Sequence, residues 1–121
     1  MTLNEIAAQL VEGCKTGQES ANLDALYAPD AVSVEAMDHG QGRETHGLDG
    51  IRGKHAWWDS AFEVMEADVS GPFPHGEDRF ALTFAVKAKD KATGEVTDMN
   101  EVAVYHVAGG KIVREEFFYG A

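Results

Sequence analysis

The stretch RFALTFAVKAK, residues 79–89, has the side-chain period of a β-strand. Large apolar residues occupy every second position and would therefore share one face of that strand: Phe80, Leu82, Phe84 and Val86. Alanine, threonine and lysine fill the positions between them. This alternation is typical of a strand with one strongly apolar face, and it marks the point where the chain leaves helical periodicity.

Turn signals around this stretch separate further strands. The segment DKATGE, residues 90–95, leads to a long strand expected over residues 96–107. The tight turn AGGK leads from there to a strand over residues 112–119. The less regular residues 62–71 supply a strand before them. Because short turns join antiparallel neighbours, this half of the chain predicts an antiparallel sheet.

The first half of the chain predicts helices instead. Thr2 and Glu5 have the spacing of a capping box, and the helix that they begin should end just before Gly17. A short second helix must end before Pro29, because proline cannot continue a helix. A third helix should begin at Leu48 and present one mostly apolar face: Leu48, Ile51, His55, Trp58 and Phe62.

Between the second and third helices, residues 31–36 read as a short strand that runs into Glu35, and residues 37–47 read as a loop with a short strand at its end. Helices followed by a run of strands predict an α+β fold. We expect three helices packed in a strongly bent antiparallel sheet, in a single domain over residues 1–121.

The composition is acidic. The 121 residues include 10 Lys and Arg against 21 Asp and Glu, which gives a net charge of −11. Nucleic acids and anionic membranes need clustered positive charge, so neither is an expected partner. The N-terminus has no basic leader region and no apolar run reaches about 18 residues, so we expect a cytoplasmic protein. The single cysteine, Cys14, falls in a predicted helix and is expected to be a buried thiol.

Neither a metal nor another cofactor is expected. The middle of the chain holds Asp38, His39, His46 and His55, but their spacing fits no known metal-ligand signature. The glycines of HGQGRETHG, residues 39–47, lack the strand-to-helix setting of a phosphate-binding loop.

Three segments occur in an order that resembles a known family: LYAPDAVSVE at residues 26–35, HGLDGIRGKHAWW at 46–58 and GGKIVREEFFYG at 109–120. The chain is similar over nearly its whole length to the SnoaL-like branch of the nuclear transport factor two-like (cystatin-like) superfamily. The resemblance implies a cone in which a bent sheet wraps a long helix and leaves a pocket. Members include ketosteroid isomerase, polyketide cyclases and binding proteins, so the fold does not decide the function.

The resemblance to ketosteroid isomerase implies roles for individual residues. Its general-base aspartate stands eight residues after a tyrosine in a matching pattern, and these places are Glu35 and Tyr27 here. A second pocket tyrosine falls on His55, and a pocket tryptophan falls on Tyr119. We expect the Glu35 carboxylate to line a cavity with Tyr27, His55 and Tyr119 and to hydrogen-bond to at least one of them.

The departures from that enzyme are equally informative. Its two oxyanion donors, a tyrosine and a protonated aspartate, fall on Val11 and near Ala103. Without them the enolate would lose several kcal/mol of stabilisation, so ketosteroid isomerisation by the known route is not expected.

Two further acids are candidates by strand alternation. Glu101 shares a face with Tyr105, and Glu115 shares a face with Phe117. A hairpin at AGGK would bring Glu101 and Glu115 within diagonal reach, where each raises the pKa of the other. One would then serve as general acid, with Glu35 or His55 as base.

Each candidate has a structural alternative. Glu115 and Glu101 could be solvated strand residues, and His55 could be a histidine satisfied within the core. Glu35 could point to water, because Val32 and Val34 lie on the opposite face of the same strand and could face the core instead. Trp57 and Trp58 are adjacent, so only one of them can face the core.

Two classes of function remain. The first is a cofactor-independent lyase, isomerase or cyclase that moves a proton on a small apolar carbonyl compound, with these catalytic candidates: Glu35, His55, Glu101 and Glu115. Six aromatic residues would bind the substrate: Tyr27, Trp58, Phe62, Phe84, Phe117 and Tyr119. The second class is a non-catalytic ligand-binding or dimerisation module with the same pocket.

A homodimer through the outer sheet face is also expected. Apolar residues lie opposite the proposed pocket face: Val102, Val104, Phe118 and Ile112. An exposed apolar patch on a sheet usually marks a partner surface, and relatives with this fold often pair there.

Overall fold

The computed structural model describes residues 1–38, 40 and 42–119. The elements follow in this order: α1 (Leu3–Thr16), α2 (Glu19–Leu26), β1 (Tyr27–Val34), β2 (Glu44–His46), α3 (Leu48–Ala61), β3 (Phe62–His75), β4 (Arg79–Asp90), β5 (Val96–Ala108) and β6 (Lys111–Phe118). The predicted α+β fold is confirmed, and so are the capping box at Thr2 and the left-handed Gly17 that ends α1.

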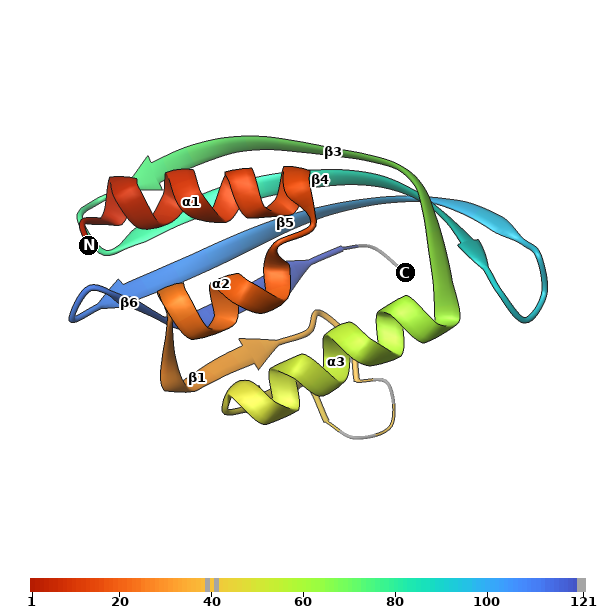
Figure 1. Cartoon of the computed structure of the whole chain (residues 1–121), viewed down its shortest axis with the longest axis horizontal. Coiled ribbons are helices and arrows are strands. Elements are labelled where there is room, and N and C mark those ends of the chain that lie inside the picture. Colours follow the sequence, from red (N-terminus) through yellow and green to blue (C-terminus); the bar gives the residue numbers. More distant parts are fainter. Residues whose placement is uncertain (39, 41, 120–121) are drawn as a thin grey trace.

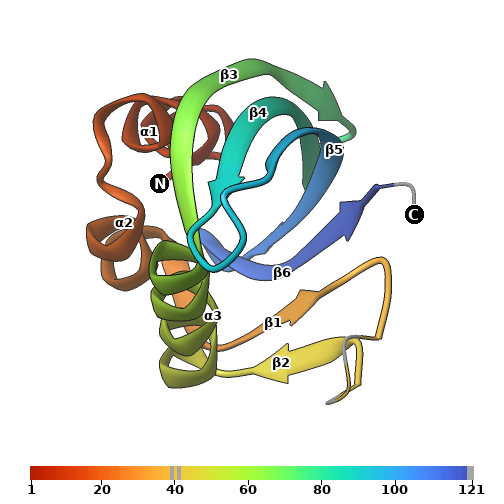
Figure 2. The same cartoon turned by 90° about the vertical axis from the view of Figure 1, so that its right-hand side faces the viewer.

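The six strands form one sheet in the order β2-β1-β6-β5-β4-β3. Figure 2 shows this sheet strongly bent, with β3, β4 and β5 arching beside α1. Helix α1 packs along β3 and β4, while α3 packs against β1, β2 and the start of β3 (Figure 1). The helices therefore cover the inner side of a curled sheet.

One pairing differs from the predicted antiparallel sheet. Strand β1 runs parallel to β6, whereas the other four pairings are antiparallel. The hairpin turns that predict antiparallel pairs lie only within β3–β6, and β1 joins β6 from far away in the chain.

Strand β1 also begins at Tyr27 and passes through Pro29, where its register with β6 is irregular. Proline lacks the N–H that a regular ladder needs, so it fits such an irregularity.

The hydrophobic core fills one end of this arrangement. Helices and strands contribute fully buried side chains: Ile6, Leu26, Ile51, Phe80, Leu82 and Ile112. Phe80 stacks on Tyr105 of the neighbouring strand, with ring centroids 5.0 Å apart. The period-two prediction for β4 is confirmed for Phe80 and Leu82.

Ile112 was predicted on the outer sheet face, and that prediction is wrong. The β5–β6 register moves from Val107 opposite Ile112 to His106 opposite Arg114, which leaves Val113 as an extra residue. This bulge reverses the alternation, and Ile112 turns into the core.

No helix in the described part of the chain is long and apolar enough to span a membrane. The Cys14 thiol is partly buried, and burial raises its pKa to about 11, which keeps it a thiol rather than a nucleophile.

Candidate functional site

Glu35 lies just beyond the end of β1 and turns its side chain toward α3 and the end of β6. Its carboxylate Oε1 is 2.6 Å from Lys54 Nζ, and its Oε2 accepts a hydrogen bond of 3.1 Å from the Tyr119 hydroxyl. The side chain is only 25% exposed. The prediction that Glu35 hydrogen-bonds to at least one of Tyr27, His55 and Tyr119 is therefore confirmed, and Tyr119 is the partner. Val34 is buried as well, so both faces of this strand end are covered.

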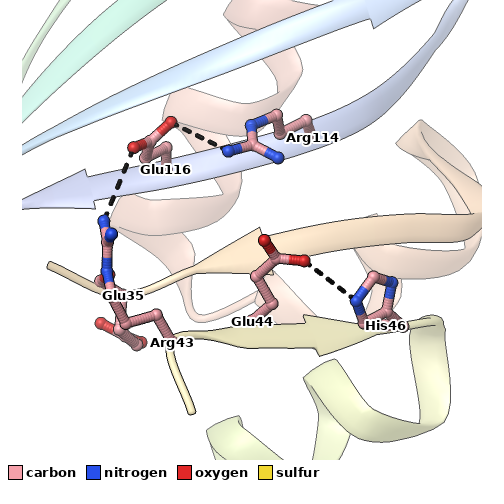
Figure 3. A network of polar contacts seen from close by, with 6 residues as sticks. All are labelled: Glu35, Arg43, Glu44, His46, Arg114 and Glu116. Atoms are coloured by element: carbon pink, nitrogen blue, oxygen red, sulfur yellow. Dashed lines mark hydrogen bonds and ion pairs between the residues drawn. The ribbon is translucent and has the colours of Figure 1, made fainter. Parts of the chain in front are cut away.

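The backbone of Glu35 is fixed from the other side by Arg43. The Glu35 N–H donates to the Arg43 carbonyl at 2.8 Å, and Arg43 Nε donates to the Glu35 carbonyl at 2.9 Å. Figure 3 shows the polar network on this outer side, in which Glu116 forms ion pairs with Arg43 and Arg114 while Glu44 pairs with His46: the labelled residues are Glu35, Arg43, Glu44, His46, Arg114 and Glu116. Arg43 thus positions the backbone of Glu35 without contacting its carboxylate.

Lys54 on α3 is a site residue that the sequence analysis missed. Its Nζ donates to Ser33 Oγ at 2.7 Å in addition to the Glu35 carboxylate. The ammonium also lies 5.4 Å from the centroid of the Phe117 ring, within the range of a cation–π contact. A signal was present, because Lys54 stands three residues after the core residue Ile51 and therefore shares its helix face.

Glu115 on β6 is buried, with 4% of its surface exposed. The Tyr27 hydroxyl donates to its Oε2 at 2.7 Å, and the Ser33 hydroxyl also hydrogen-bonds to it. Burial raises the pKa of the Glu115 carboxyl, while these hydrogen bonds and the charge of Lys54 oppose that rise. The Tyr27 hydroxyl, expected to lie beside Glu35, thus hydrogen-bonds to Glu115 instead.

Glu101 lies on the inner face of β5, opposite Phe84. The predicted diagonal contact with Glu115 is wrong, because Glu115 pairs with Tyr105 and its diagonal neighbour is Ala103. Burial raises the pKa of the Glu101 carboxyl, the negative charge of Glu35 adds to the rise, and the charge of Lys54 opposes it. The charge of Glu115 also raises this pKa, so the predicted electrostatic effect of Glu115 on Glu101 is confirmed although the two are not diagonal neighbours. The Glu101 carboxylate makes no hydrogen bond or ion pair with any residue in the described ranges.

His55 lies close enough to Glu115 for its charge to act on that carboxylate. Its Nδ1 atom is buried and has no hydrogen-bond partner among the residues that the structure describes. The partners of the Glu35 carboxylate are Lys54 and Tyr119. The structure gives no hydrogen bond between His55 and Glu35 among the described residues.

Aromatic side chains surround this polar group. Trp58 stacks on Phe62 with centroids 4.6 Å apart, and Phe84 and Phe117 pack against the edge of the core. Trp57, by contrast, is 63% exposed. Burial and the nearby Glu35 raise the pKa of Tyr119 to about 12, so its hydroxyl remains a donor at neutral pH.

An open hollow reaches this region from the sheet. Inner residues and outer residues of β3–β6 line it together: Asp68, Ser70, Thr83, Phe84, Ala85, Asn100, Glu101, Val102, Phe118 and Tyr119. A second hollow lies between α1 and α2. Neither hollow is lined by Glu35, Lys54, Tyr27, His55 or Glu115, so the predicted cavity shared by Glu35, Tyr27, His55 and Tyr119 is neither of these two hollows.

Two of the four residues considered for a metal, His46 and His55, have different neighbours in the structure. His46 bonds to Glu44, whereas His55 lies near Glu115 on the inner side. His39 lies outside the described residues. Within the described part of the chain, no three histidine, cysteine, aspartate or glutamate side chains are grouped as metal ligands.

Comparison with known proteins gives one family and many similar folds. The family model of the SnoaL-like domain matches residues 1–119. A protein from Mesorhizobium loti, provisionally named a SnoaL-like polyketide cyclase, is 39% identical, with a TM-score of 0.91 over 98% of this chain and 100% of that one. A search of curated proteins finds no match.

Two more distant structures share the fold alone. An NTF2-like protein from Burkholderia thailandensis is 18% identical, with a TM-score of 0.85 over 99% of this chain and 92% of that one. A Bacillus subtilis protein provisionally named an isomerase is 13% identical, with a TM-score of 0.76 over 96% of this chain and 84% of that one.

Proposed function

This chain belongs to the SnoaL-like family, and from that premise we propose that it is a cofactor-independent enzyme that moves a proton on a small, uncharged carbonyl compound. Isomerisation, cyclisation and elimination all begin with removal of a proton next to a carbonyl group. The fold hosts several such reactions, so the function depends on the residues of the site.

The observation that carries the proposal is the convergence of two unlike carboxylates on one inner surface. Glu35 is held in place by Lys54 and Tyr119, whereas Glu101 has no partner in the described structure. The pKa of Glu101 is raised by burial and by the charge of Glu35. When the surroundings of two carboxyl groups differ in this way, one group is suited to act as base and the other as acid.

The chemistry needs no group that the chain lacks. Glu35 would take the proton from the carbon beside the carbonyl, and the electron pair of that C–H bond would form a C=C bond while the carbonyl π pair moves to oxygen. Glu101 would deliver its proton to another carbon or to a leaving group. Each carboxyl then exchanges its proton with water, and the cycle balances without an oxidant or reductant.

The charges around the site favour an uncharged substrate. Glu35, Glu101 and Glu115 face the single ammonium of Lys54, so an anionic ligand would meet net repulsion. The aromatic residues Trp58 and Phe117 would contact the apolar part of such a molecule. Steroid isomerisation remains disfavoured, because Val11 and Ala103 lie in the core and offer no hydrogen-bond donor.

Hydrogen–deuterium exchange tests this function. A panel of small ketones, aldehydes and esters in D₂O would be followed by proton NMR with and without the protein. We expect Glu35→Gln to slow exchange of the active compounds by about a hundredfold or more, because it keeps the shape and removes the base. Glu66→Gln, which changes an exposed acid on β3, is the matched control. Equal rates in wild type and Glu35→Gln would contradict the proposal.

A second proposal concerns assembly, and a specific observation favours it. Val102 and Phe118 pair across β5 and β6 on the outer face and are 39% and 48% exposed. We propose that this face joins two copies of the chain, since apolar residues on a water-facing sheet carry a solvation cost that a second copy removes. Light scattering at micromolar concentration should report twice the monomer mass, and a monomer mass would refute the pairing.

A further inference from the structure

Proton removal from a neutral carbonyl compound leaves a negative oxygen that must be stabilised. The positions that would supply donors by resemblance are Val11 and Ala103, and both are buried apolar residues. A different group must therefore do this work if Glu35 is the base. The candidate is the side chain that touches the Glu35 carboxylate already.

We propose that Lys54 is the catalytic residue that binds the carbonyl oxygen of the substrate and stabilises the enolate. This inference rests on the proposed function, because it assumes that Glu35 removes a proton. It assigns the stabilisation of the enolate oxygen to a residue of α3. The family resemblance placed that role on α1 and β5 instead, at Val11 and near Ala103.

The hydrogen bonds of Lys54 leave room for a ligand. An ammonium carries three donors. One reaches Glu35 Oε1 at 2.6 Å and another reaches Ser33 Oγ at 2.7 Å. The third has no hydrogen-bond acceptor among the described residues. The side chain is 25% exposed, so part of Lys54 is open to a ligand.

The spacing between Lys54 and Glu35 matches the reaction. A carbonyl oxygen and a hydrogen on the adjacent carbon lie within about one hydrogen-bond length of each other, so base and oxygen donor must be neighbours. Lys54 and Glu35 are neighbours in direct contact. One carbonyl compound can therefore accept from the ammonium while its C–H faces the carboxylate.

The charge balance of the site also fits. Before the reaction, Lys54 compensates the negative charge of Glu35. Afterwards Glu35 carries the proton and the charge lies on the enolate oxygen, which is bound to the same ammonium. The negative charge thus moves between two partners of one cation, so the site needs little rearrangement as the charge moves.

Ser33 and Glu115 hold Lys54 in this position from below. Ser33 is fully buried on β1, accepts from the ammonium and hydrogen-bonds to Glu115. The Phe117 ring lies on another side of the ammonium, 5.4 Å away. These contacts fix the side chain before a ligand arrives, which is the condition for effective oxyanion stabilisation.

The test uses a stable mimic of the enolate in a protein without the base. para-Nitrophenolate carries its charge on an oxygen conjugated to an apolar ring, and binding would be measured by difference absorbance. In the Glu35→Gln background, Lys54 has no anion to compensate at that position, so the phenolate should bind. Adding Lys54→Met should weaken binding by about tenfold or more, the usual effect of losing one charged hydrogen bond.

Matched variants make the result specific. Lys54→Arg in the same background should keep affinity within a few-fold, because it keeps a charged donor. Lys89→Met removes an exposed lysine on β4 and should change nothing. para-Nitrotoluene, an uncharged probe of similar shape, should bind equally well with and without Lys54. Absence of phenolate binding in Glu35→Gln, or equal binding with and without Lys54, would overturn the inference.

The two proposals fail in different ways. If Lys54 controls phenolate binding but no carbonyl compound exchanges deuterium, the proposed reaction is wrong while the anion-binding role stands. If exchange depends on Glu35 and is unchanged in Lys54→Met, the reaction stands and the role of Lys54 is wrong. If Lys54→Met slows exchange without affecting phenolate binding in the Glu35→Gln background, Lys54 only positions the base, and the inference is also wrong.

Discussion

Each face of the β5–β6 hairpin carries some residues that an ordinary sheet would place on the other face. The inner face carries the acids Glu101 and Glu115, whereas the outer face carries Val102, Val104 and Phe118. An antiparallel sheet with one covered face normally buries apolar residues and exposes polar ones. Buried acids lower stability unless they are paired, and exposed apolar residues have a solvation cost. The buried acids on the inner face are therefore consistent with the proposed chemistry. The exposed apolar residues on the outer face are consistent with the proposed contact between two copies.

The largest difference between the two faces should appear in the free energy of unfolding when a buried core residue is replaced. Phe80 is 1% exposed and stacks on Tyr105. Replacing Phe80 by alanine should lower the free energy of unfolding by about 3–5 kcal/mol, because it removes buried area and leaves a cavity. Urea unfolding followed by circular dichroism measures this.

The matched change on the outer face is Phe118→Ala, which removes the same side chain where it is 48% exposed. Its effect on the monomer should be several-fold smaller than that of Phe80→Ala. Equal losses of unfolding free energy at the two positions would contradict the contrast between a buried inner face and an exposed outer face.

The sequence predicted the architecture because its signals are local. The alternation of β4 and the turns around it are read from neighbouring residues, and these predict which side chains face inward. The capping box of α1 is equally local. The parallel pairing of β1 with β6 is not, since its residues lie 82–85 positions apart in the chain and no turn joins them.

The site was predicted in part for the same reason. Resemblance placed Glu35 and Tyr119 together, and their hydrogen bond is confirmed. The bulge at Val113 reversed the expected direction of Ile112, because alternation carries no signal for an extra residue. The contact of Lys54 with Glu35 depends on how α3 crosses β1, which helical spacing alone does not specify.

A smaller effect should appear in the pH dependence of stability. The pKa of Glu115 is raised in the folded protein by burial. A raised carboxyl pKa stabilises the fold below the unfolded value of about 4.3, and this contribution is lost as the pH rises through the folded value. Between these two values the free energy of unfolding should fall by up to about 1.4 kcal/mol per pH unit from this group.

Glu115→Gln isolates that contribution, because groups common to both proteins cancel in the difference. The stability of wild type minus that of Glu115→Gln should fall as the pH rises above about 4.3 and then level off. The amide can still accept from the Tyr27 hydroxyl, which limits other losses. Chemical unfolding at a series of pH values provides the data, and a difference that stays flat across this range would contradict a raised pKa.

The smallest effect on the free energy of unfolding is expected for a substitution on the outer face. The same substitution should change the mass of the assembly. Phe118→Lys places a charge at a half-exposed position, so the stability of the monomer should change by about 0.5 kcal/mol or less. In a dimer through this face, two such charges would be buried against each other and the pair should dissociate. Sedimentation equilibrium should then report the dimer mass for wild type and the monomer mass for Phe118→Lys. Trp57→Lys changes an aromatic residue of similar exposure on α3 and should leave the dimer intact, so dissociation by both variants would show that the contact lies elsewhere or is unspecific.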